Sequence, residues 1–271
     1  MNRLLKCFGS IVVVAMLGIA AFMLSGKILR SVDIFELIGE ANPDVEFLVA
    51  YLLPMLLMLI GVVLFNRIVL RPKERTMWSI RGFNPLVHLW CFALLVALAV
   101  VLSPLMRLLP ASGRVVPTNL WAVVTVIVVA PVMEEILFRG NIFSIMRASC
   151  GPTLAAVISS ALFAVMHGET AVAIEAFFSG MIFSCAYILT CSIFAPIILH
   201  ILSNIVAYVL LNFTYQEKSI QDYIGALSSF DMIYAISLGI LLLGLVYIVY
   251  VYYRADRGVK QGKLLRDVMK K

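Results

Sequence analysis

The chain has 271 residues, of which 63% are hydrophobic and 13% charged, with a net charge of +6 and a mean hydropathy of +1.04. This hydropathy excludes an ordinary soluble domain, and apolar runs long enough to cross a bilayer recur along the whole chain. The positive charge does not indicate nucleic-acid binding, because the basic residues lie in short loops and at the chain ends, as they do beside membrane spans.

In chain order, the apolar segments predict an all-α, polytopic membrane bundle of about eight transmembrane helices, forming a single domain over residues 1–271. The predicted spans are 8–26, 47–65, 86–106, 119–147, 153–170, 171–192, 195–213 and 230–253. We interpret the first run as a span rather than a signal peptide, because no clear small-x-small cleavage site follows it. The basic residues gather at the N-terminus, in the loop 66–85 and in the tail 254–271. This distribution predicts an N-in, C-in topology in a plasma membrane, with 254–271 as a basic cytoplasmic tail.

An acidic motif within the fourth predicted span places two adjacent carboxylates, Glu134 and Glu135, and the guanidinium of Arg139 in an apolar run. Glu135 and Arg139 are four residues apart, so on a helix they share a face and can pair. Glu134 lies about 100° further round and is left to face a cavity. Ionised groups inside a membrane need partners or a function. The motif therefore indicates either proton chemistry at Glu134 or an ion-pair cluster that only locks helices together.

His167, in the fifth predicted span, is expected at the depth of Glu134. The fourth and fifth spans form a hairpin with its tip near Cys150 and Gly151. Counted from that tip, Glu134 lies about 20 Å along one helix and His167 about 22 Å along the next, at roughly 1.5 Å per residue. The sequence therefore predicts a carboxylate–imidazole pair inside the membrane.

His200 and Asn204 are four residues apart in the seventh predicted span and share a helix face. Both side chains can donate N–H groups into a cavity. His200 lies only about one turn into its span, so it reaches the depth of Glu134 only if the uncharged turn before it is recessed. The alternative interpretation is a hydrogen-bonded pair that holds two helices together.

A carboxylate, two histidines and an asparagine around a wet pocket suit hydrolysis. Glu134 is the predicted general base on a water, and His167 orients that water. His200 and Asn204 are the predicted donors to the oxyanion of a tetrahedral intermediate. In the alternative, Glu134, His167 and His200 bind zinc as a two-histidine, one-carboxylate site. Other patterns of membrane proteases and metal sites are absent, since the chain has no HExxH, GxSG, GxGD or CxxC.

Three motifs in order on successive apolar segments resemble the CPBP family of membrane proteases. They are Glu134-Glu135-xxx-Arg139, Phe163-xxx-His167 and His200-xxx-Asn204, and they define a catalytic core over 119–213. This family, also called Abi, groups CAAX-processing and bacteriocin-immunity proteins and includes the Ras-converting CAAX endopeptidase. The resemblance implies a glutamate-dependent intramembrane endopeptidase that cuts a peptide or lipopeptide. It also implies that Glu134, His167, His200 and Asn204 are catalytic, with Glu135 and Arg139 supporting them.

The family is labelled as metalloproteases, but we favour a metal-free mechanism with no cofactor, because the asparagine and the arginine suit an oxyanion hole better than a cation site. Zinc stays the alternative.

Two other functions compete with proteolysis. One is a non-proteolytic membrane immunity or signalling-partner protein. The other is a proton-coupled transporter, for which buried acids and histidines are also typical, although the chain shows no repeat that relates its halves.

Overall fold

The structure is a computed structural model, and it describes residues 3–31, 43–70, 78, 83–109, 119–213, 225 and 229–269. Every regular element in these ranges is helical. The first four elements are α1 (Arg3–Ser31), α3 (Pro43–Leu64), η1 (Phe65–Leu70) and α4 (Pro85–Met106). The long central helix consists of α5 (Leu120–Val124), η3 (Thr125–Val129), α6 (Ala130–Glu135), η4 (Ile136–Ile142) and α7 (Phe143–Cys150). The remaining elements are α8 (Pro152–Val165), α9 (Thr170–Thr190), α10 (Phe194–Phe213), α12 (Phe230–Lys260) and α13 (Leu265–Met269).

The predicted all-α, polytopic membrane bundle is confirmed. Among the described residues, six helical stretches are long and apolar enough to cross a membrane: Leu5–Arg30, Val45–Ile68, Pro85–Met106, Leu120–Cys150, Thr170–Thr190 and Phe230–Lys260. The fifth and seventh predicted spans are also apolar helices, but they are shorter, over Pro152–Val165 and Phe194–Leu210. The number of crossings and the orientation stay predictions.

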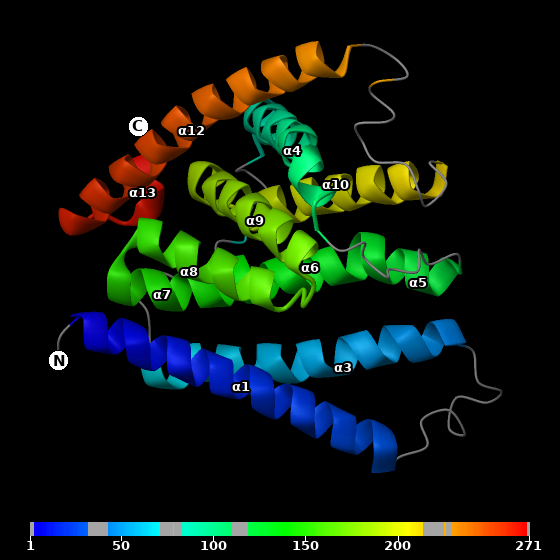
Figure 1. The fold of residues 1–271 in the computed structure, drawn as a ribbon. Coiled ribbons are helices and arrows are strands. Elements are labelled where there is room, and N and C mark those ends of the chain that lie inside the picture. Colours follow the sequence, from blue (N-terminus) through cyan, green and yellow to red (C-terminus); the bar gives the residue numbers. More distant parts are fainter. Residues whose placement is uncertain are drawn as a thin grey trace.

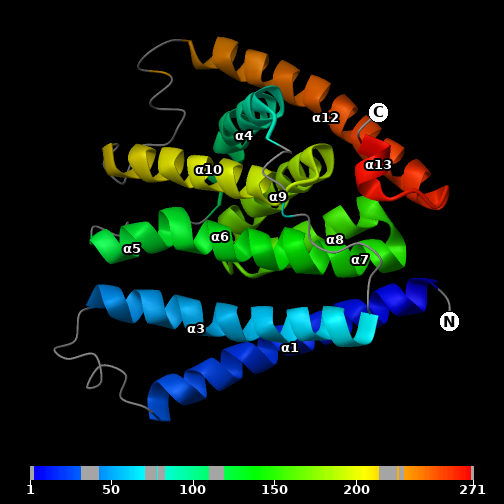
Figure 2. The same ribbon diagram turned by 180° about the vertical axis from the view of Figure 1, so that it is seen from behind.

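The helices are arranged in layers around the central helix. Helices α1 and α3 lie side by side along one edge of the bundle, and α12 lies along the opposite edge, with α5 to α10 and α4 between them (Figures 1 and 2). The α1 start and α13 lie at the same end of the bundle (Figure 1), as an even number of crossings requires. Large apolar side chains on the outer faces of α1 and α12 are exposed, as lipid-facing helices require.

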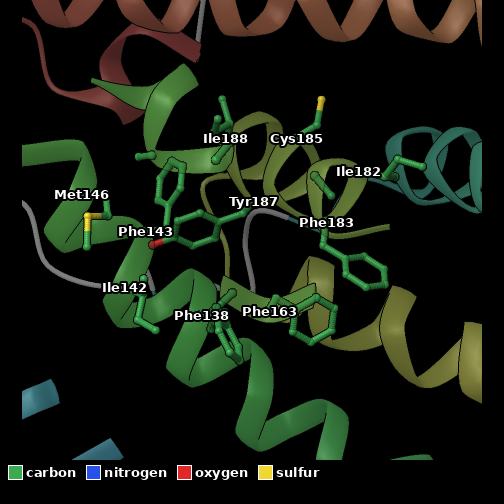
Figure 3. Packing of buried hydrophobic residues seen from close by; sticks show 14 of the residues in the cluster. Phe138, Ile142, Phe143, Met146, Phe163, Ile182, Phe183, Cys185, Tyr187 and Ile188 are labelled. Carbon is green, nitrogen blue, oxygen red and sulfur yellow. The ribbon is translucent and has the colours of Figure 1, made fainter. Parts of the chain in front are cut away.

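The core lies where η4, α7, α8 and α9 meet. Phe138, Phe143, Phe163, Phe183 and Tyr187 are almost completely buried there, and their rings fill the space between these helices (Figure 3). Phe143 packs edge-on against Tyr187, and Phe138 packs edge-on against Phe163. Such edge-to-face pairs stabilise a core by about 0.5 to 1.5 kcal/mol beyond area burial.

The C-terminal segment predicted as a tail is folded where the structure describes it. Helix α12 continues to Lys260, and α13 returns so that Val268 packs on Gly258, where a Cβ would collide with it. The guanidinium of Arg254 donates a hydrogen bond of 2.9 Å to the carbonyl of Val268. Leu265 is fully buried. The segment is therefore basic in composition but packs against the bundle.

The hairpin tip between α7 and α8 is held by α12. Gly151 has φ of +90°, in the region that favours glycine, and ends α7. Pro152 begins α8, where its missing N–H is not needed. The backbone N–H of Thr153 donates to Asp256 Oδ1 at 3.1 Å. An acid from a distant helix thus supplies the N-terminal cap that α8 lacks locally.

Candidate active site

Glu134 and Glu135 lie on α6, a six-residue α-helical segment between two π-helical ones. A π-helix bonds residue i to i+5, which widens the helix and shifts its register, and such segments are frequent at functional sites. Side chains stabilise the wide segment η4. The Asn141 amide donates to the carbonyl of Ile136 at 2.9 Å, and the Ser159 hydroxyl of α8 donates to the carbonyl of Phe138 at 3.0 Å.

The predicted pair of Glu135 and Arg139 is confirmed. Arg139 Nη1 lies 2.8 Å from Glu135 Oε1, and both side chains are fully buried. The guanidinium also lies against aromatic faces, with its carbon 4.6 Å from the ring centroid of Phe163 and 5.4 Å from that of Phe183. Such cation–π contacts stabilise a desolvated arginine by about 2 kcal/mol. This carboxylate is therefore neutralised inside the protein.

His200 is the side chain that joins the two glutamates. Its Nδ1 lies 3.0 Å from Glu135 Oε1, and its ring stacks on Phe183 with 4.9 Å between centroids. Because a carboxylate only accepts hydrogen bonds, Nδ1 carries the proton and Nε2 is the nitrogen left for chemistry. The sequence predicted the partnership of Glu135 with Arg139 but not the one with His200.

Glu134 faces this free nitrogen. Its Oε2 lies 3.8 Å from His200 Nε2, beyond the range of a direct hydrogen bond. Its Oε1 accepts a hydrogen bond of 2.8 Å from the hydroxyl of Tyr51 on α3. The carboxylates of Glu134 and Glu135 and the guanidinium of Arg139 together leave one negative charge. A proton shared between Glu134 and His200 would cancel it. The arrangement is therefore suited to holding and moving a proton.

His200 and the turn before it are buried in the bundle, and the position of this turn below the membrane surface stays a prediction. Cys191 takes the left-handed conformation with φ of +50° and ends α9. Ser192, Ile193 and Ala195 are all buried. The turn carries no charge, so it can enter the bundle without leaving an ionised group unpaired.

His167 does not pair directly with Glu134. Helix α8 ends at Val165 rather than near residue 170, and His167 lies in the turn that follows. Its Nδ1 lies 2.8 Å from the carbonyl of Phe163, one of the last four carbonyls that a helix leaves unsatisfied. Within the described residues, no hydrogen bond or ion pair joins His167 to Glu134. The helix stops here because Gly168, with φ of +71°, permits the chain to reverse.

The aromatic ring of Phe163 connects His167 to the rest of the site. It packs edge-on against His167 at 4.6 Å and against His200 at 5.7 Å between centroids. The Phe163 ring is almost completely buried and lies beside Phe183 (Figure 3). The two imidazoles thus contact the same ring. Since Nδ1 of His167 donates to a carbonyl, its Nε2 is the basic nitrogen.

Asn204 donates from its amide nitrogen to the carbonyl of Val126 in η3, at 2.9 Å. This bond has a local cause. The N–H of Ala130 donates to Thr125, and the next residue, Pro131, has no N–H for the carbonyl of Val126. The side chain of Asn204 supplies that donor from α10. The helix-linking role that the sequence offered as an alternative is therefore present, and it uses one of the two amide N–H groups.

Tyr51 is the site residue that the sequence analysis missed. It lies in the second predicted span, and no motif surrounds it. A tyrosine near the end of a span is ordinarily read as an interfacial residue. Only the packing of α3 against α5, α6 and η4 brings it to Glu134.

The zinc alternative, with Glu134, His167 and His200 as ligands, stays a prediction. Across the residues that the structure describes, no three histidine, cysteine, aspartate or glutamate side chains are grouped to hold a metal ion. Nδ1 of His200 lies at Glu135 and Nδ1 of His167 lies at the Phe163 carbonyl, which leaves Nε2 of each ring for other contacts. The metal-free mechanism stays a proposal.

Fold and site together define an all-α, polytopic membrane protein with a buried Glu–His–Arg cluster. Residues 116–206 match the family described as type II CAAX prenyl endopeptidase Rce1-like. The chain is similar to the membrane-embedded CAAX protease MroQ of Staphylococcus aureus (strain USA300), with 29% identity over 148 residues, covering 50% of this chain and 58% of that protein. It is also similar to an uncharacterized 24.3 kDa protein of Escherichia coli, with 32% identity over 124 residues, covering 44% of this chain and 57% of that protein.

These matches support the resemblance to the CPBP family of CAAX proteases that the three motifs predicted. The alignments span less than three fifths of the length of either relative. No solved structure matches the chain.

Proposed function

We propose that the chain is an intramembrane endopeptidase that hydrolyses a peptide bond of a membrane-associated peptide or lipopeptide. The observation that carries this proposal is the arrangement around Glu134. Glu135 and Arg139 neutralise each other, whereas Glu134 keeps one oxygen 3.8 Å from an imidazole nitrogen. A partly buried carboxylate beside a histidine is a group suited to general acid–base catalysis.

The proposed reaction begins with a water bound by Glu134. A water about 2.8 Å from both Glu134 Oε2 and His200 Nε2 fits geometrically, because these atoms are only 3.8 Å apart. Glu134 removes a proton as the water oxygen attacks the peptide carbonyl carbon. His167, whose ring contacts Phe163 as the ring of His200 does, is the proposed assisting base through its Nε2. The carbonyl oxygen becomes an oxyanion.

His200 and Asn204 are the proposed donors to that oxyanion. His200 donates from Nε2 as an imidazolium, which the Glu135 carboxylate at its Nδ1 stabilises. Asn204 offers the amide N–H that Val126 does not use. When the intermediate collapses, the C–N bond breaks and Glu134 returns its proton to the leaving amine. The products are a carboxylic acid and an amine. In this proposal the reaction consumes one water, and every proton transfer uses a protein side chain.

The membrane peptides of cells carrying the wild type, Glu134→Ala or Glu46→Gln, compared by mass spectrometry, test this function. Glu46 lies on α3 with an exposed side chain, so Glu46→Gln removes a carboxylate outside the site. We expect fragments that occur with the wild type and with Glu46→Gln but disappear with Glu134→Ala. Equal fragments in all three strains, with equal amounts of inserted protein, would contradict the proposal.

The competing function is a non-proteolytic immunity or signalling-partner protein. It is favoured by the polar bonds that also link helices, since Asn204 joins α10 to η3 and His200 joins α10 to α6. Glu134→Gln separates the two functions, because it keeps the shape of the side chain and its ability to accept from Tyr51. A scaffold keeps its cellular phenotype with this variant, whereas a protease loses it.

A further inference from the structure

Tyr51 belongs to the N-terminal hairpin, outside residues 116–206 that carry the family match. Its hydroxyl donates a 2.8 Å hydrogen bond to Glu134 Oε1 across 83 residues of sequence. Phenol oxygens that donate to carboxylates make short, strong bonds. Among the described residues, this hydrogen bond is the one direct polar contact between α3 and Glu134.

The bond decides which oxygen of Glu134 is available. The last torsion of a glutamate is soft, so an unrestrained carboxylate exchanges its two oxygens readily. In the structure Oε1 is held by Tyr51, and Oε2 is the atom that lies 3.8 Å from His200 Nε2. Tyr51 thus fixes the plane of the carboxylate and directs Oε2 to the imidazole.

The hairpin that carries Tyr51 is closely packed, so the hydroxyl has a defined position. A Cβ on Gly61 of α3 would lie 3.2 Å from Leu17 of α1, and a Cβ on Gly18 of α1 would lie 3.3 Å from Met58 of α3. Glycines therefore let α1 and α3 approach closely, as small residues do between membrane helices. The pair packs in turn on α5, α6, η4 and α7.

We propose that Tyr51 is a positioning residue for Glu134, and that α3 thereby completes the active site. This role rests on the proposed endopeptidase function. Tyr51 neither takes nor gives a proton in the reaction, and it acts only by holding the general base. A residue with such a role changes the rate of the chemical step and leaves substrate binding unchanged.

The test compares Tyr51→Phe with Tyr252→Phe. Phenylalanine keeps the ring and its packing and removes only the hydroxyl. Tyr252 is a buried tyrosine of α12 whose hydroxyl donates to the carbonyl of Met181 at 2.8 Å, so its variant removes an equivalent hydrogen bond elsewhere. The probe is a synthetic copy of a membrane peptide whose cleavage in cells requires Glu134.

We expect Tyr51→Phe to lower kcat by about 10- to 100-fold with KM unchanged, the usual size for residues that orient a catalytic group. Its unfolding temperature should match that of Tyr252→Phe, whose kcat should equal that of the wild type. In the Glu134→Gln background, Tyr51→Phe should cause no further loss, because the oriented base is already gone. Equal kcat values for both tyrosine variants would overturn the proposal. So would a loss explained by a lower unfolding temperature.

A readout that needs no substrate separates this proposal from the proposed function. The infrared difference spectrum of wild type minus Glu134→Gln isolates the carboxylate band of Glu134. We expect Tyr51→Phe, and not Tyr252→Phe, to shift that band. If the band shifts and no peptide requires Glu134, the endopeptidase function fails while the positioning contact stands. An unshifted band ends the role of Tyr51 whatever the activity.

Discussion

Gly180 of α9 lies against the guanidinium of Arg139. A Cβ at Gly180 would lie 2.7 Å from Arg139 Nη2 and 2.9 Å from Ser160 Oγ, closer than such contacts occur. Arg139 is fully buried and holds Glu135, so its position has little freedom. The absent side chain of Gly180 is therefore what lets α9 approach the ion pair.

Gly180→Ala tests this packing. We expect the variant to lose about 1 to 3 kcal/mol of stability, the usual cost of overfilling a packed core. Gly239→Ala is the matched control, since Gly239 lies in α12 with nothing within 4 Å of its added Cβ. Alanine there should be neutral or stabilise the helix by up to about 1 kcal/mol. Thermal unfolding in detergent measures both, and equal midpoints would contradict the close approach.

Glu135→Gln tests the orientation of His200. The amide retains the size of the side chain but removes the negative charge at His200 Nδ1 and the ion pair with Arg139. We expect cleavage of the Glu134-dependent peptide to fall by about 10- to 100-fold, as for other groups that orient a catalytic histidine. Glu46→Gln should cleave at the wild-type rate. Cleavage by Glu135→Gln at the wild-type rate would show that His200 needs no anion.

Asn204→Ala tests whether the Asn204 side chain replaces the backbone hydrogen bond that Pro131 cannot donate. The variant leaves the carbonyl of Val126 without its side-chain donor. Hydrogen bonds between membrane helices contribute about 0.6 to 1.7 kcal/mol, so we expect a loss of that size. Pro131→Ala restores a backbone N–H at the position that lacks one. The double variant should therefore unfold at a higher temperature than Asn204→Ala alone. No recovery would mean that the proline is not the cause of the unsatisfied carbonyl.

Gly168→Ala tests the turn that places His167. The added Cβ would meet nothing within 4 Å, so any cost comes from the backbone, whose φ is +71°. A non-glycine residue in this region costs about 1 to 2 kcal/mol. Asparagine tolerates it better, so Gly168→Asn should be the more stable of the two. Unfolding midpoints in detergent compare the variants, and the opposite order would place the strain elsewhere.

The apolar helices of the bundle and the ion pair could be predicted from the sequence, because both follow from local spacing. Long apolar runs define the spans, and a separation of four residues brings Glu135 and Arg139 together. The three motifs likewise located the segment that matches the family model. None of these inferences needed contacts between distant helices.

The contacts that define the site depend on tertiary packing and were not predictable in this way. Tyr51 reaches Glu134 only through the docking of the N-terminal hairpin. His200 is closer to the glutamates than expected, and His167 is held at a helix end by a backbone carbonyl. Helix α8 ends at Val165 because of Gly168. A single glycine did not change the prediction of a longer helix, which followed from the apolar residues of the span 153–170. The register shifts in η3 and η4 depend on donors from other helices, such as Asn204 and Ser159.

The contact between Asp256 and the start of α8 has a practical consequence for work with this protein. Asp256 is the group from α12 that accepts the Thr153 N–H. A shortened version that stops at residue 255 would expose that helix start and loosen the hairpin on which Phe163 and His167 are carried. Truncations for crystallisation should therefore retain Asp256, and a purification handle belongs beyond Met269.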